Sequence, residues 1–147
     1  MLHSDRARLE FVLKMINDIE IVVSRHKNIE NTLNDVEGYH AIMMCLMQIG
    51  ESLGKIVDIH LKELLPSELA YKMRNIIAHD YIGINNKVII STVTNDLPLL
   101  KKQIESILKD NSWKILTFKF VIYFSQVEWI FKIYFQYVRG YKKLWRI

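Results

Sequence analysis

Apolar residues recur every three or four positions along most of the first 110 residues of this chain. This period places them on one face of a helix, and it differs from the two-residue alternation of a half-buried strand. The first run predicts a helix that begins at Ser4 or Asp5, either of which could cap it, and ends near Arg25. Its apolar face consists of Leu9, Val12, Leu13, Ile16, Ile19 and Val23. The polar stretch that follows, residues 27–34, is predicted to be a linker.

A second helix is predicted to start at a capping box, because Glu37 stands three residues after Asn34. Apolar residues continue on one side of this helix as far as Val57. Gly50 and Gly54 are four residues apart on it. Two glycines at that spacing indicate that another helix packs closely against this one.

Two further helices are expected. Pro66 is tolerated in the first turn of a third helix, which should end shortly after Tyr81. A fourth helix is predicted over residues 88–108. Pro98 interrupts it and cannot donate a backbone hydrogen bond, so we expect a kink or a restart there, with Asp96 as the cap of the second piece.

The charge of the chain is unevenly distributed. Residues 1–112 hold 13 Lys and Arg against 15 Asp and Glu, whereas residues 113–147 hold 7 against 1. The second segment also contains 12 of the 16 aromatic residues. We therefore predict a helical bundle over residues 1–112 and an aromatic, basic extension over residues 113–147. The extension could be an added helix of the bundle, a segment that binds a membrane surface or nucleic acid, or a stretch without a selected role.

Several classes of site are not indicated. The single cysteine, Cys45, lies in an apolar run and fits a small core residue in a reducing cytoplasm. The early charges from Asp5 onward argue against a signal peptide, and Phe120–Phe124 is too short to span a membrane. The sequence contains no glycine-rich phosphate loop and no metal-ligand spacing, so we expect neither a metal nor another cofactor.

The segment from Arg74 to Tyr81 contains the side chains best suited to catalysis. Arg74 offers a permanent planar cation, and His79 an imidazole, a group that generally titrates near neutral pH. On an ideal helix they lie about 140° apart around the axis with a rise of about 7.5 Å, so they could flank a bound group. Such a pair could cleave an RNA phosphodiester without a metal. The alternative is structural, since Arg, Asn and His near a helix end also bind its free carbonyls.

This segment, Arg74-Asn75-Ile76-Ile77-Ala78-His79-Asp80-Tyr81, resembles the R-x4-H-x-Y motif of HEPN-domain proteins, specifically the HepT-like toxins. The resemblance covers roughly residues 5–110. It includes Tyr39-His40-Ala41 through Gln48-Ile49-Gly50-Glu51-Ser52-Leu53, Leu65-Pro66, and Asn95-Asp96-Leu97-Pro98-Leu99-Leu100.

The resemblance implies an all-α, up-and-down bundle of four or five helices that forms a homodimer. It implies a metal-independent endoribonuclease in which Arg74 clamps the phosphate, His79 is the acid–base group and Asn75 positions His79 or the RNA. Glu51 is either a solvated carboxylate or a network partner that fixes Arg74. In this family a minimal nucleotidyltransferase antitoxin (MntA-like) adds AMP to the motif tyrosine, here Tyr81. The alternative is a non-catalytic nucleotide-binding or scaffold subunit of a nucleotidyltransferase complex.

Overall fold

The computed structural model of this protein describes residues 1–79 and 84–109. The all-α prediction is confirmed, because these residues form helices and turns and contain no strand. The helical elements are α1 (His3–Arg25), α2 (Ile29–Asn34), α3 (Val36–Gly54), α4 (Ile59–Leu64), α5 (Ser67–His79), α6 (Asn86–Ser91), the π-helical turn η1 (Thr92–Asp96) and α7 (Leu97–Lys109).

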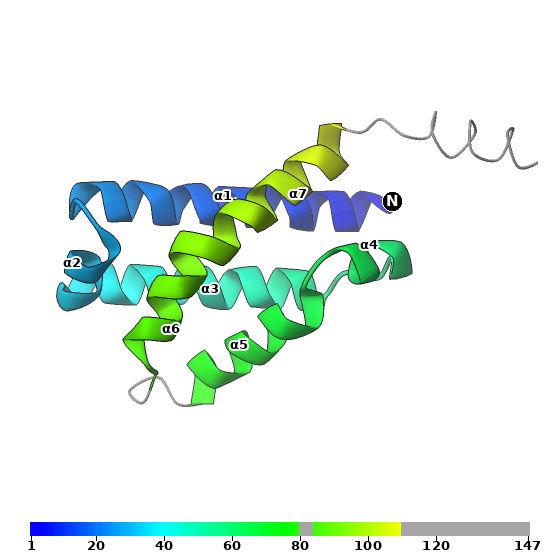
Figure 1. Cartoon of the computed structure of the whole chain (residues 1–147). Coiled ribbons are helices and arrows are strands. Elements are labelled where there is room, and N and C mark those ends of the chain that lie inside the picture. Colours follow the sequence, from blue (N-terminus) through cyan, green and yellow to red (C-terminus); the bar gives the residue numbers. More distant parts are fainter. Residues whose placement is uncertain (80–83, 110–147) are drawn as a thin grey trace, which may run out of the picture. The chain divides into compact units, whose positions relative to one another are not determined.

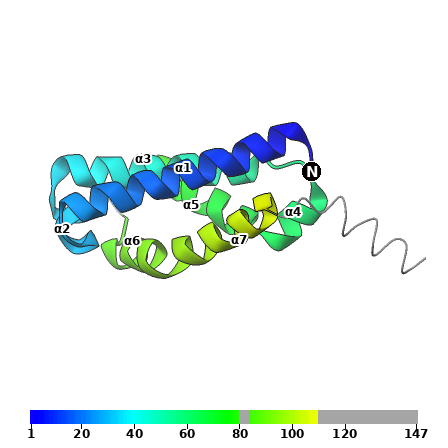
Figure 2. The same ribbon diagram turned by 90° about the horizontal axis from the view of Figure 1, so that it is seen from above.

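The core lies where the longer helices meet. Figure 1 shows α1 and α3 lying along each other, and α5 and α7 pack against α3 and α1, respectively. Seen from above in Figure 2, α6 and α7 run beside the α1–α3 pair and form a second layer. Fully buried side chains fill the space between these helices, among them Leu9, Val12, Ile16, Ile19, Ile42, Met43, Leu53, Ile77, Ile89 and Ile104. The expected apolar face of the first helix is thus largely confirmed.

The start of α1 differs from the prediction. The helix begins at His3, and its N-cap residue, Leu2, makes no side-chain capping bond. Asp5 is fully buried instead of acting as a cap, and its carboxylate accepts hydrogen bonds from the backbone N–H groups of Val57 and Asp58 at 3.2 and 3.0 Å. Arg8 Nη1 donates to the same carboxylate at 3.0 Å. A local capping rule cannot reveal this role, because the backbone N–H groups that Asp5 binds are more than 50 residues away in sequence.

The predicted linker over residues 27–34 is wrong in part, because α2 occupies most of it. The side chain of Asn28 caps this short helix by accepting a hydrogen bond from the N–H of Asn31 at 2.8 Å. Ile29 and Leu33 are buried, which explains why a mostly polar segment folds onto the bundle. The predicted capping box is also wrong, since Asp35 is the N-cap of α3 and accepts from the N–H of Gly38 at 2.8 Å.

The connection between α3 and α5 contains a helix that the sequence pattern did not predict. The carboxylate of Asp58 starts α4 by accepting from the N–H groups of His60 and Leu61. Ile56 is buried in the turn before it, but Val57 is exposed, so the apolar face assigned to the second helix ends one residue too late.

In α5, four apolar residues recur at helical spacing and predict a core face, but this prediction is mostly wrong. Leu69 and Ile76 are exposed, Met73 is partly buried, and only Ile77 of the four is buried. The predicted end of this helix after Tyr81 falls on residues 80–83, outside the described part of the chain.

The predicted interruption near Pro98 exists, but its form differs from a kink. The chain passes from α6 through η1 into α7, and the N–H of Leu97 bonds to the carbonyl oxygen of Thr92, five residues earlier. Because Pro98 has no N–H, it cannot continue the regular i to i−4 pattern at this point. Asp96 lies inside the π-helical turn rather than capping a new helix.

No helix in the described ranges is long and apolar enough to cross a lipid bilayer. The aromatic, basic extension over residues 113–147 lies outside these ranges. Its boundary with the bundle and its structure stay predictions.

Candidate functional site

The helices α3 and α5 approach each other closely at two glycines, as their spacing predicted. A Cβ atom added to Gly50 would lie 2.4 Å from the carbonyl oxygen of Ala70 and 2.6 Å from the Cβ atom of Arg74. A Cβ atom at Gly54 would lie 2.5 Å from Cδ2 of Tyr71. All three distances are shorter than real Cβ contacts, so a side chain at either position would force a neighbour to move; at Gly50 that neighbour is the backbone of α5. The contact places the backbone of Ala70 and the Cβ atom of Arg74 directly against α3.

The guanidinium of Arg74 is held on two sides. Its Nε atom lies 2.9 Å from Oε2 of Glu51 on α3. The N–H bond does not point at this oxygen, so the contact is an ion pair rather than an aligned hydrogen bond. Nη1 of Arg74 donates to Oδ1 of Asn75 at 3.0 Å. The side chain keeps 31% of its surface exposed, and within the described residues Nη2 makes no hydrogen bond. Donors therefore remain for an anion.

Glu51 joins two cations. Its Oε1 atom lies 2.8 Å from Nζ of Lys55, and its Oε2 atom faces Arg74. The hydrogen bond from Lys55, together with the charges of Lys55 and Arg74, holds the pKa of Glu51 below its ordinary value, although partial desolvation opposes this. Of the two expectations for Glu51, the contact with Arg74 is the one found. The three side chains carry a net charge of +1, which favours an anionic ligand over a cationic one.

His79 lies near the exposed end of α5. It follows Arg74 by five residues, which corresponds to a rise of about 7.5 Å along a regular helix. Its side chain is exposed and makes no hydrogen bond or ion pair with the described residues. Asn75 accepts a hydrogen bond from Arg74; the role that the resemblance implies for it, positioning His79 or the RNA, stays a prediction. Tyr81, the expected modification site, lies outside the described residues.

Tyr71 belongs to the same surface, and sequence reasoning missed it. The Cζ atom of Arg74 lies 5.9 Å from the centre of the Tyr71 ring, within the range of a cation–π contact. Tyr71 is 43% exposed. Its position three residues before Arg74 is the signal that could have revealed it, because residues at that spacing are neighbours on a helix.

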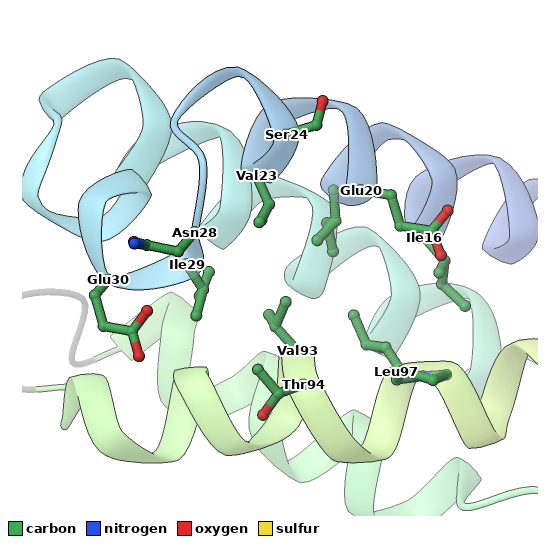
Figure 3. A pocket seen from close by; sticks show the side chains of 12 residues that line it. Ile16, Glu20, Val23, Ser24, Asn28, Ile29, Glu30, Val93, Thr94 and Leu97 are labelled. Carbon is green, nitrogen blue, oxygen red and sulfur yellow. The ribbon is translucent and has the colours of Figure 1, made fainter.

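In the described part of the protein, Arg74 is partly exposed and His79 is exposed. Neither of two pockets in the described part of the protein includes these residues. One pocket of about 580 Å³ lies between α3, α5 and α7. The other, of about 450 Å³, lies between α1, α2 and the η1–α7 segment. Figure 3 shows Val23 and Ile29 pointing into it from one side, and Val93 and Leu97 from the other.

The other residues with reactive or metal-binding side chains make contacts that fit a structural role. Cys45 is partly buried against the core, and burial raises the pKa of its thiol, which disfavours the reactive thiolate. His26 is partly buried. Its Nδ1 atom lies 2.9 Å from the carbonyl oxygen of Val22, and its Nε2 atom lies 3.3 Å from Oδ2 of Asp35. Within residues 1–79 and 84–109, no three His, Cys, Asp or Glu side chains are arranged to hold a metal ion.

Comparisons with known proteins agree on one family. Residues 12–107 match the family described as "Ribonuclease HepT-like". The chain is 31% identical over 107 residues to "Putative RNase MJ1216" and to "Putative RNase MJ0125" of Methanocaldococcus jannaschii; this covers 71% of this chain and 88% and 91% of those proteins. It is 29% identical over 110 residues to "Putative RNase TTE0752" of Caldanaerobacter subterraneus, covering 71% of this chain and 94% of that protein. No solved structure matches the chain.

The match to the family includes the whole of α3 and α5, and therefore every residue of the Glu51–Arg74–His79 surface. The protein thus belongs to the HepT-like family of HEPN ribonucleases.

Proposed function

We propose that this protein is a metal-independent endoribonuclease in which Arg74 binds the phosphate and His79 transfers protons. The observation that carries the proposal is the fixed guanidinium of Arg74. It is paired with Glu51 and bonded to Asn75, yet it keeps free donors. A planar guanidinium suits phosphate oxygens because its N–H groups form a fork of matching geometry.

His79 is one helical turn and a half beyond this cation and is free to meet a substrate. As a base, it would take the proton from a ribose 2′-hydroxyl while the 2′-oxygen attacks phosphorus. The bond to the 5′-oxygen would then break, and an acid would protonate this leaving oxygen. The products would be a 2′,3′-cyclic phosphate and a 5′-hydroxyl, with no water consumed. Each proton transfer of this kind typically contributes about 10²–10⁴ in rate.

A base and an acid are both needed, and each copy of the motif supplies one imidazole. We therefore propose a homodimer in which two copies of α5 face one groove, so that His79 of one protomer acts as base and the second copy as acid. The partial exposure of Arg74 and the exposure of His79 are compatible with this assembly, since a second protomer could form the other wall of the groove.

We further propose that the protein is the toxin of a toxin–antitoxin pair and that a nucleotidyltransferase antitoxin (MntA-like) neutralises it. The expected target is Tyr81, two residues after His79. An adenylyl group there would add bulk and negative charge close to the groove. Both effects oppose the binding of a polyanion.

The test compares the wild type with His79→Ala and Arg74→Ala on purified RNA in the presence of a chelator. We expect the wild type to cleave the RNA and both variants to lose this cleavage. Expression of the wild type should inhibit growth, and expression of His79→Ala should not. Intact RNA with the wild type would refute the nuclease. Tight binding of the transferase partner that survives His79→Ala, without cleavage, would instead favour the scaffold alternative. For the regulation, co-expression with the transferase should add AMP-sized mass steps that Tyr81→Phe removes.

A further inference from the structure

We infer that Tyr71 forms a nucleobase subsite beside Arg74, on which one unpaired base of the RNA stacks while Arg74 holds the neighbouring phosphate. The inference rests on the proposed RNA-cleaving function and adds to it a contact that selects the form of the substrate. The observation behind it is that an exposed aromatic ring lies next to the one guanidinium that the proposal needs.

The ring has a fixed position. Its Cδ2 and Cγ atoms lie against Gly54, where an added Cβ atom would be 2.5 and 3.1 Å away. The absence of a side chain at Gly54 allows the ring to lie on the surface of α3, and the helix behind it prevents it from moving further inward. The ring is not part of the core cluster of the described residues, and 43% of the residue is exposed. Part of the ring is therefore both accessible and held in place.

The ring is also at the correct position along the helix. Tyr71 precedes Arg74 by three residues, a rise of about 4.5 Å, while His79 lies on the opposite side of Arg74 along the axis. The order along α5 is therefore ring, guanidinium, imidazole. A single strand that lies along the helix can place a base on Tyr71, a phosphate at Arg74 and the reacting ribose towards His79.

Stacking on aromatic rings is how proteins commonly hold unpaired bases, and it tolerates any base because every base has a π-face. A base inside a duplex is covered on both faces by its neighbours, so it cannot stack on Tyr71. The subsite thus predicts that the preferred substrate is single-stranded at the position of cleavage, with weak dependence on which base is present.

A binding cycle tests the subsite directly. The ligand is a 2′-O-methyl RNA strand, which cannot be cleaved through the 2′-oxygen, and each base is removed from it in turn. On the wild type, removal of the stacked base should weaken binding about 5- to 150-fold. Tyr71→Leu should weaken binding of the intact strand by a similar factor but should show no further loss with the abasic strand. Tyr71→Phe should behave like the wild type.

The non-additivity separates stacking from a merely structural role. If Tyr71 only supported Arg74, Tyr71→Leu would weaken intact and abasic strands equally, and that result would overturn the inference. Gly54→Ala provides a second variant, because it displaces the ring without removing it and should reduce the same base-dependent factor. Cleavage by the wild type is measured separately with unmodified RNA. Cleavage with an additive cycle refutes the subsite alone, whereas absence of cleavage refutes the proposed nuclease.

Discussion

Replacement of Gly50 by alanine should push α5 away from α3 and move Arg74 with it. The new Cβ atom would lie 2.4 Å from the carbonyl oxygen of Ala70, whereas ordinary contacts begin at 3.4 Å. The two helices would have to separate locally by about 1 Å, because a backbone carbonyl in a helix cannot rotate away. The Cβ atom of Arg74, at 2.6 Å from the same position, would be displaced in the same direction.

Two opposing terms decide the effect on stability. Overpacking of this kind costs about 1–3 kcal/mol. Alanine in place of a mid-helix glycine returns about 0.5–1 kcal/mol through the smaller entropy of the unfolded chain. The free energy of unfolding should therefore fall by roughly 0–2.5 kcal/mol, with a central expectation of about 1 kcal/mol. The effect on catalysis should be larger, since a 1 Å misplacement of a substrate-binding group can reduce the rate about 100-fold.

Gly54→Ala is the matched control. It lies at the end of the same helix, and its Cβ atom would meet the ring of Tyr71 rather than a backbone atom. Because Tyr71 is partly exposed, its side chain can rotate outward, and we expect stability to change by less than about 0.5 kcal/mol. Urea unfolding of both variants makes the stability comparison, and RNA cleavage by Gly50→Ala is compared with the wild type. If Gly50→Ala were as stable as Gly54→Ala and as active as the wild type, the close contact of α3 and α5 at Gly50 would be refuted.

Three further predictions concern stability. Asp5→Ala should lower the free energy of unfolding by about 3 kcal/mol, because it leaves buried N–H groups without an acceptor. The control in urea unfolding is Asp18→Ala, which removes an exposed helical ion pair and should cost less than about 0.5 kcal/mol. Equal effects of the two substitutions would contradict the role of Asp5. The pKa of Glu51 is lowered in the folded state, so the ionised carboxylate contributes to the free energy of unfolding above pH 4.5, its ordinary pKa, and this contribution is lost as the pH falls through the lowered pKa. Glu51→Gln should therefore lose less stability than the wild type on acidification. Parallel profiles of stability against pH would argue against the pairing with Lys55. Lys27 has a positive φ of 73°, which is strained for a residue with a side chain, so Lys27→Gly should raise the free energy of unfolding by up to about 1 kcal/mol. A thermal midpoint equal to or below that of the wild type would contradict this.

The candidate site was predictable in its residue types and in its spacing along α5. Arg74, Asn75 and His79 come from a single segment, so the sequence alone places them within two turns of one helix. For Glu51 the sequence allows both a solvated carboxylate and a partner of Arg74, and periodicity does not distinguish the two. The choice depends on the distance between two helices, which Gly50 and Gly54 set by letting α5 approach α3. Tyr71 was missed because an aromatic residue at helical spacing looks the same in a core as on a surface.

The sequence by itself determined that the chain is helical, where its long helices run, and which segment holds the cation and the imidazole. These properties follow from local periodicity and from side-chain chemistry, which need no knowledge of distant contacts. Only the tertiary structure decided the surroundings of these groups: the burial of Asp5 under the α3–α4 connection, the exposure of Leu69 and Ile76, and the carboxylate that pairs with Arg74. The physical reason is that desolvation and ion pairing depend on which helices meet and at what separation, and no single helix contains that information.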